Sequence, residues 1–251
     1  MLILLPPSET KRAGGTGRSL SLADLRFPEL TEARRQLTND VVELAADPDA
    51  TIAALKLGPK QHAEVSVNRE LWQSPTMPAI DRYTGVLFDA LDASTLDAEA
   101  REFAARHVLV HAALFGPIGA LDPIPAYRLS HDSRVPGRPM KRHWASPIRE
   151  ALAAHDGLLL DMRSEAYVAL GPAPATPYSF YLRVLTDGPD GSRRALNHFN
   201  KKAKGEFTRA LLEARVPFAT ADELCAWAPK AGFRLERLYP ASGKQELALL
   251  V

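Results

Sequence analysis

Disulfides and membrane spans are the features that this sequence most clearly lacks. Only one of the 251 residues is a cysteine, Cys225, so no disulfide can form within the chain, as is usual in a reducing compartment. No apolar run approaches the ~20 residues that a helix needs to cross a bilayer. The apolar start at residues 1–5 is shorter than the core of a secretion signal, and no cationic stretch precedes it. We therefore expect a cytoplasmic protein without membrane association.

The sequence also lacks the signature motifs of several large enzyme classes. The Gly-x-Ser-x-Gly elbow, the phosphate-binding loop of nucleoside triphosphatases and the dinucleotide-binding fingerprint are all absent. His107 and His111 are four residues apart, but the branched residues between them favour a strand and no third ligand is evident. We interpret them as core histidines, and we expect neither a metal nor a cofactor.

Apolar periodicity predicts one mixed α/β or α+β domain that spans residues 1–251. Hydrophobic residues make up 46% of the chain, which is enough for a large core. Apolar runs and amphipathic segments interleave without regular βαβ spacing, which indicates one continuous mixed sheet with helices around it. Residues 79–91 fit a strand or a helix. We expect strands at residues 1–5, 108–115, 158–162, 178–186, 233–239 and 246–251, a hairpin partner at 194–199, and helices at 30–46, 50–57, 96–107, 149–155 and 201–215.

The net charge of +1 says little about partners, but the positive charge is unevenly distributed. Residues 134–149 carry five cations and no acid, and residues 193–204 carry five more, again without an acid. We expect the first stretch to be a loop that presents its cations together with Trp144. The alternative is that both stretches are ordinary solvated surface.

Three lysines stand at the predicted start of the helix at residues 201–215. Asn200 is a suitable N-cap, which would place Lys201, Lys202 and Lys204 near the positive end of the helix dipole. Cations are disfavoured there by ~0.3–1 kcal/mol each. A bound phosphate would offset this cost, with Gly205 leaving room for the ligand. A helix that starts near Glu206, with the lysines in a loop, is the alternative.

Polar side chains follow two of the predicted strands, where α/β proteins often place ligand contacts. Glu9 is a candidate general base. Tyr167 is suited to stacking on a base or sugar. Ordinary helix capping explains residues 8–11 equally well, and an ordinary strand-to-helix turn explains residues 161–167 equally well. The candidate phosphate contacts in these two segments are Ser8, Lys11, Arg163 and Ser164.

Two glycine-containing segments complete the candidate site. Tyr83 and Thr84 place two hydroxyl groups beside a glycine, and Arg128 follows two prolines on a rigid loop. Gly116 and Gly119 are similar in spacing to the hairpin of a helix-hairpin-helix, whose backbone N–H groups hold DNA phosphates. A buried tight turn would have the same pattern.

Taken together, these segments resemble the YaaA family of bacterial peroxide stress proteins. The resemblance extends from residue 1 to about residue 212. It rests on the order and spacing of residues 1–11, Tyr-Thr-Gly at 83–85, residues 114–129, Trp144, Arg-Ser-Glu-Ala-Tyr at 163–167 and Lys-Lys-Ala-Lys-Gly at 201–205.

The resemblance implies a compact α/β fold with a positively charged cleft and a helix-hairpin-helix-like element at residues 115–122. It also implies a cytoplasmic protein that binds DNA and limits free iron and DNA damage under peroxide stress, and we expect a monomer. The cleft would hold Ser8, Glu9, Lys11, Tyr83, Thr84, Arg128, Arg163, Ser164, Tyr167, Lys201, Lys202 and Lys204.

A second hypothesis is an enzyme that cleaves or transfers at a glycosidic bond of a nucleotide-like small molecule. Glu9 would be its acid/base or nucleophile, while Arg163, Lys201 and Lys204 would anchor the phosphate. A carboxylate in a cationic cleft would repel phosphate, so a pure DNA-binding protein has little need of Glu9. The sequence leaves open whether the protein is an enzyme.

Overall fold

The first strand of the chain, β1 (Leu2–Leu5), lies in the interior of the main sheet, and its four residues are apolar and buried. Continuous apolar residues suit a parallel strand that is covered on both faces. Ile3 lies opposite Val108 on one side, and Leu4 lies opposite Asp161 on the other. The computed structural model describes the whole chain except residues 189–192, 196–198 and 241–242.

The main sheet has the order β4-β3-β1-β6-β7-β10-β9, with β8 paired to β7. Five strands that are adjacent in the sheet run parallel to one another: β3, β1, β6, β7 and β10. The strands β4, β8 and β9 are antiparallel to their neighbours. This arrangement confirms the predicted mixed α/β domain. The further strands are β3 (Val108–Ala112), β4 (Gly116–Gly119), β6 (Leu159–Asp161), β7 (Ser179–Asp187), β8 (Arg193–Ala195), β9 (Arg234–Leu238) and β10 (Glu246–Leu250), and β2 (Met77–Pro78) pairs with β5 (Pro123–Ile124) separately.

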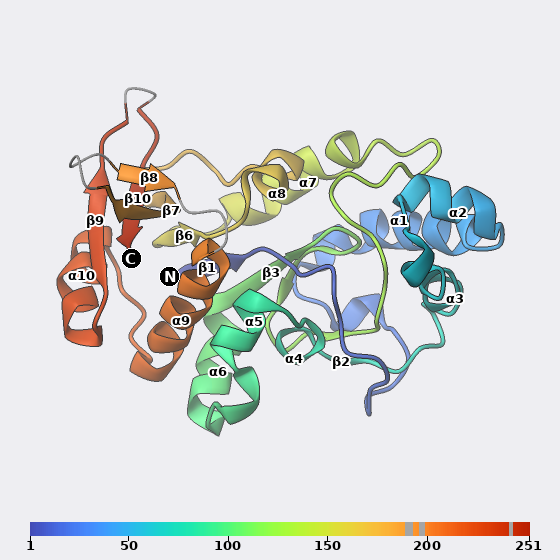
Figure 1. Ribbon diagram of the computed structural model, residues 1–251, viewed down its shortest axis with the longest axis horizontal. Helices are drawn as coiled ribbons and strands as arrows, with labels where there is room; N and C mark the ends of the chain where they lie inside the picture. The colour runs from blue at the N-terminus through green and yellow to red at the C-terminus, as the bar shows by residue number, and fades with distance from the viewer. Residues whose placement is uncertain (189–192, 196–198, 241–242) are drawn as a thin grey trace.

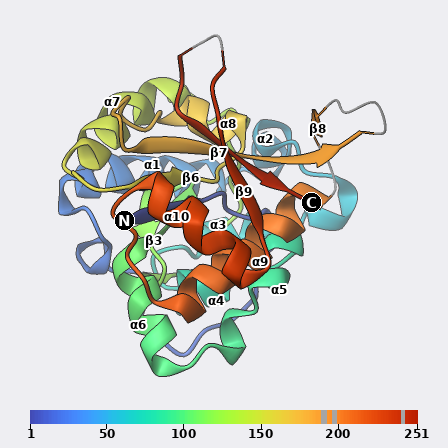
Figure 2. The ribbon, with the colours of Figure 1, turned by 90° about the vertical axis from the view of Figure 1, so that its left-hand side faces the viewer.

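Helices cover both faces of this sheet (Figures 1 and 2). α7 and α8 pack together on one face, while α6 and α9 lie on the other, and α1, α2 and α3 form a group beside α7. The helices are α1 (Thr31–Leu44), α2 (Pro48–Leu55), α3 (Glu64–Arg69), α4 (Ala79–Arg82), α5 (Val86–Leu91), α6 (Ala98–His107), α7 (Met140–Ala153), α8 (Glu165–Leu170), α9 (Phe199–Ala214) and α10 (Ala221–Trp227).

Most predicted elements are confirmed, often with their caps. Asp47 accepts a hydrogen bond from Ala50 N at the start of α2, and Asp97 accepts one from Ala100 N at the start of α6. The ambiguous residues 79–91 form the helices α4 and α5, separated at Gly85. The hairpin partner of β7 is β8. Residues 196–198 of the predicted partner strand lie outside the described residues, and Phe199 begins α9.

The prediction of a loop that presents Trp144 is wrong. α7 begins at Met140, and the indole is fully buried, with Nε1 donating to Ala113 O over 2.8 Å. Met140, Trp144 and Ile148 recur every four residues and all face the core. This apolar stripe outweighs the helix-breaking tendency of Pro147, which lies within the helix.

The segment predicted as a DNA-binding hairpin forms a β-strand. Gly116 and Gly119 are the two ends of β4, which is buried and antiparallel to β3. Gly119 N donates to Asp122 Oδ2 over 2.8 Å, and a Cβ added at Gly116 would lie 3.1 Å from the Trp144 ring. These glycines therefore permit close packing at the margin of the sheet. They lie in a strand and not in a turn between two helices.

Candidate functional site

The connections of β1 define where this fold can bind a ligand. The chain runs from β1 to β3 on one side and then crosses to β6 on the other side. In open α/β sheets, ligands bind outside the carboxyl ends of the strands at such a switch point. The two loops that follow β1 and β6 hold five of the predicted site residues, namely Ser8, Glu9, Lys11, Arg163 and Ser164. We call Glu9, Lys11, Tyr83, Tyr127, Arg128 and Tyr167 the switch-point cluster.

An ion pair joins two distant segments in this cluster. Arg128 Nη2 lies 2.8 Å from Glu9 Oε2. Asn68 fixes the backbone of Arg128 with two hydrogen bonds of 2.8 Å, one to its N–H and one to its carbonyl. The side chain of Arg128 is 9% exposed and that of Glu9 is 63% exposed. The guanidinium is thus held in place, whereas its carboxylate partner is open to solvent.

Lys11 extends beneath this pair, over two tyrosine rings. Its Nζ lies 4.1 Å from the ring centre of Tyr127 and 5.3 Å from that of Tyr83, and it donates to the carbonyls of Ser8 and Glu9. Burial, together with the positive charge of Arg128, lowers the pKa of Lys11 to about 7. The charge of this ammonium therefore changes near neutral pH.

Hydroxyl groups gather next to Lys11. Ser8 Oγ lies 3.2 Å from Thr10 Oγ1, and Thr84 N donates to Thr10 O over 3.2 Å. Gly85 has a φ of 96°, and a Cβ there would lie 3.2 Å from Ser8 Oγ. The loop after β1 and the Tyr83–Gly85 segment are therefore brought together, as the site prediction requires.

The tyrosines of the cluster are packed inside the protein. Tyr83 OH lies 2.8 Å from Tyr127 OH, and burial raises the pKa of both phenols. Tyr167 is 8% exposed and makes edge contacts with His111 and His131. The rings of Tyr83 and Tyr167 are both buried, so the base stacking predicted for Tyr167 has no support in this arrangement.

Arg163 lies below the site and is fully buried. It donates to both carboxylate oxygens of Asp161 over 2.8 and 2.6 Å, and to Gly171 O over 2.8 Å. A third partner, His111 Nδ1, accepts over 2.7 Å, because arginine can only donate. This hydrogen bond fixes the imidazole as the Nε2–H tautomer. Burial, together with the positive charge of Arg163, holds the pKa of His111 well below its usual value. Arg163 is thus a structural residue and not an exposed phosphate contact, whereas Ser164 beside it is exposed.

The lysines of α9 do not converge on one point. Helix α9 begins at Phe199, one residue before the predicted cap. Lys201 is exposed, Lys202 pairs with Glu206 at 3.4 Å, and Lys204 is only 4% exposed. Burial lowers the pKa of Lys204 to about 8, and its Nζ lies 5.8 Å from the Tyr181 ring.

Gly205 does not leave space for a ligand. A Cβ at this position would lie 2.2 Å from Leu87 O and 2.9 Å from Ala90 Cβ. The glycine therefore allows α9 to pack directly on α5, and the predicted role is corrected to helix packing.

Each of the two cation-rich stretches keeps four of its five cations exposed. Arg134, Lys141, Arg142 and Arg149 are exposed, while Arg138 pairs with Asp40. In the second stretch, Arg193 pairs with Asp187 and Glu236. Within the described part of the chain, no helix is long and apolar enough to cross a membrane, and the His, Cys, Asp and Glu side chains form no group of three or more that could hold a metal ion.

Residues 1–237 match a family described as "Peroxide stress protein YaaA". The chain belongs to this family. A UPF0246 protein of Corynebacterium glutamicum strain R is 41% identical over 256 residues, which cover all of both chains. A UPF0246 protein of Corynebacterium efficiens is 42% identical over 241 residues, covering 94% of this chain and 95% of the relative. One from Streptomyces coelicolor is 40% identical over 257 residues, covering 99% and 97%.

The YaaA-like motifs of the sequence thus divide into three groups in space. Those after β1 and at residues 83–85 meet around Lys11, together with Arg128. Arg163 and Lys204 are buried close to Asp161, and Lys201 and Lys202 lie on the surface of α9. Sequence reasoning missed Asn68, Tyr127 and His131. The only signal for Tyr127 was its place directly before Arg128, within the motif at residues 114–129.

Proposed function

We propose that this YaaA-family protein protects cells from peroxide by binding DNA, with Lys11 and Arg128 as its central phosphate contacts. The observation that carries the proposal is the position of these two cations at the switch point, close enough that burial and the charge of Arg128 together lower the pKa of Lys11, with Lys11 Nζ donating to Ser8 O. Ser164 and Lys201 would add contacts at the margin. A DNA phosphate would replace Glu9 as the partner of Arg128, since guanidinium binds phosphate and carboxylate with similar geometry.

We propose that the protein contacts DNA phosphates and not bases, because the aromatic rings of the candidate site are packed inside the protein. Tyr83 and Tyr167 of the switch-point cluster are buried, and so is Trp144. Phosphate contacts carry little sequence information and weaken as salt concentration rises. We therefore propose binding that is salt-sensitive and nearly independent of sequence.

Binding of this kind would limit iron-dependent damage at the DNA itself. Ferrous ions associate with phosphates, and the hydroxyl radicals that they form with peroxide react where they are generated. A protein that occupies the phosphates would displace the iron from the backbone. The proposal thus needs no iron ligands in the protein.

A plasmid-nicking assay tests this proposal. Supercoiled plasmid would be treated with ferrous iron and hydrogen peroxide, with wild type or with the Lys11→Met/Arg128→Gln variant. We expect wild type to reduce nicking and the variant to lose most of this protection. The control, Lys60→Met/Arg134→Gln, removes two exposed cations outside the cluster. Equal nicking with wild type and with no protein would contradict the proposal.

The Glu9–Arg128 pair also favours a second candidate, an enzyme acting on a nucleotide-like small molecule. A positioned carboxylate next to a lysine whose pKa is about 7 supplies groups suited to acid–base chemistry. The Glu9→Gln variant separates the two functions in cells under peroxide stress. Retained protection supports DNA binding alone, whereas lost protection with intact DNA binding supports catalysis.

A further inference from the structure

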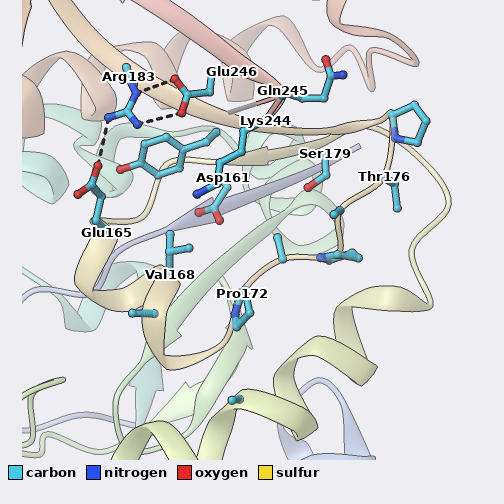
Figure 3. A pocket seen from close by; sticks show the side chains of 18 of the residues that line it. Asp161, Glu165, Val168, Pro172, Thr176, Ser179, Arg183, Lys244, Gln245 and Glu246 are labelled. Atoms are coloured by element: carbon cyan, nitrogen blue, oxygen red, sulfur yellow. Dashed lines mark hydrogen bonds and ion pairs between the residues drawn. The ribbon is translucent and has the colours of Figure 1, made fainter. Parts of the chain in front are cut away.

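A cavity lies on the other side of α8 from the switch-point cluster. It has a volume of about 1000 Å3 and is lined by residues of α7 and α8, residues 172–177, one face of β7 and the start of β10 (Figure 3). Successive helical residues are turned by about 100°. Glu165, Val168 and Ala169 therefore line this cavity, while Tyr167 points away from it, toward His131. The helix separates two distinct sites.

One wall of this cavity is apolar and rigid. Small aliphatic side chains from α8 stand opposite a proline-rich segment that cannot donate many backbone hydrogen bonds. Ligand pockets of 300–1,000 Å3 with this composition typically take the apolar body of a small molecule. The wall consists of Val168, Ala169, Pro172, Ala173, Pro174 and Pro177.

The acidic groups on the floor of the cavity are already paired. Arg183 donates to Glu246 over 2.7 and 2.9 Å and to Glu165 over 3.1 Å, as the dashed lines in Figure 3 show. Asp161 is bonded by the buried Arg163. The floor therefore presents no unpaired carboxylate to an incoming ligand.

The rim, in contrast, carries cations without an acidic partner. Lys141 at the start of α7 and Lys244 before β10 both line the cavity and are exposed. Neither makes an ion pair with a carboxylate among the residues that the structure describes. An anionic group at this rim would meet positive charge, because the carboxylates that line the cavity are held by Arg163 and Arg183.

We propose that this cavity binds a small amphiphilic anion, with its apolar body against the proline-rich wall and its carboxylate, sulfonate or phosphate beside Lys141 and Lys244. The proposal does not depend on DNA binding, because it uses a different face of α8.

A pair of fluorescent probes tests this assignment. 8-Anilinonaphthalene-1-sulfonate has the required apolar body and anion, and N-phenyl-1-naphthylamine has the same rings without the sulfonate. Each would be titrated with the full-length protein. We expect saturable binding of the sulfonate at one site. Lys141→Glu should weaken that binding about fivefold, as expected for a partly exposed ion pair, and leave the uncharged probe unaffected. Arg142→Glu, the same charge change one residue outside the lining, is the control.

A bulky substitution tests the location independently. Ala169→Trp places an indole in the cavity from an exposed position and should weaken both probes about tenfold. Ala153→Trp, at an exposed position of α7 outside the lining, should not. The proposal is overturned if the sulfonate shows no saturable binding, if Ala169→Trp behaves like Ala153→Trp, or if Lys141→Glu behaves like Arg142→Glu. Loss of DNA binding in any variant leaves this test unaffected, because the readout is the probe.

Discussion

Glu9 and Arg128 lie 119 positions apart in the chain and form an ion pair of 2.8 Å. Arg128 is nearly buried and needs an anionic partner, because an unpaired buried charge is costly. Glu9 is mostly exposed, so its own contribution to the pair is worth little. The Glu9 carboxylate thus takes the place that an external anion could occupy beside Arg128. A phosphate can displace this carboxylate.

Glu9→Gln should therefore tighten binding to duplex DNA about threefold to tenfold, because it removes the internal competitor and one negative charge. Fluorescence anisotropy at low salt measures this change. Glu70→Gln removes an exposed carboxylate outside the cluster and should have almost no effect. Weaker binding by Glu9→Gln would show that Glu9 contributes to the site instead of competing with the ligand.

Lys11 should make DNA binding dependent on pH. Its pKa of about 7 means that the ammonium is charged below pH 7 and largely neutral at pH 8.5. Affinity should fall about tenfold from pH 6 to pH 8.5, since a hydrogen bond from a charged donor is lost. Lys11→Arg keeps its charge across this range and should flatten the profile. An unchanged slope in Lys11→Arg would mean that another group titrates.

Much of this fold follows from local patterns, and the site follows from them only in part. The buried runs of β1 and β10 and the capped helices α2 and α6 are visible in the sequence because each depends on neighbouring residues. The rule that ligands bind after parallel strands predicts a site at the loop of Ser8 and Lys11, and this loop lies at the switch point of the sheet. Spacing could also have shown that Lys204 is buried, since it lies on the same helical face as Thr208 and Leu211.

Other features depend on contacts that no local pattern contains. The pairing of Asn68 with the backbone of Arg128, and of Tyr83 with Tyr127, joins segments that are 60 and 44 residues apart. Arg163 follows a strand, as a ligand-binding residue would. Its burial depends on Gly171 and His111, which the fold brings over it.

Arg163→Ala should destabilise the protein by about 3–5 kcal/mol, because Asp161 would be left buried without its partner. Urea denaturation measures the change in the free energy of unfolding. Arg142→Ala, which removes an exposed arginine, should change it by no more than about 0.5 kcal/mol. A stable Arg163→Ala variant with reduced DNA affinity would instead make Arg163 a ligand contact.

Gly205→Ala should also destabilise the protein, by about 1–3 kcal/mol, because the new Cβ would collide with Leu87 O and separate α9 from α5. Thermal unfolding followed by circular dichroism detects the loss. Glu206→Ala, one residue further along the helix and exposed, should stay within about 0.5 kcal/mol of wild type. If Gly205→Ala unfolds like wild type, the close contact between the two helices is not required.

The most direct test of the account is the salt dependence of DNA binding at pH 6 for wild type and Lys11→Met/Arg128→Gln. Each phosphate contact contributes about 0.9 to the slope of log affinity against log salt, so the double variant should lose about 1.8 from the wild-type slope. The Lys60→Met/Arg134→Gln control should keep that slope. Absence of salt-dependent binding by wild type, or equal slopes for the cluster variant and the control, would contradict the claim that the switch-point cluster binds DNA.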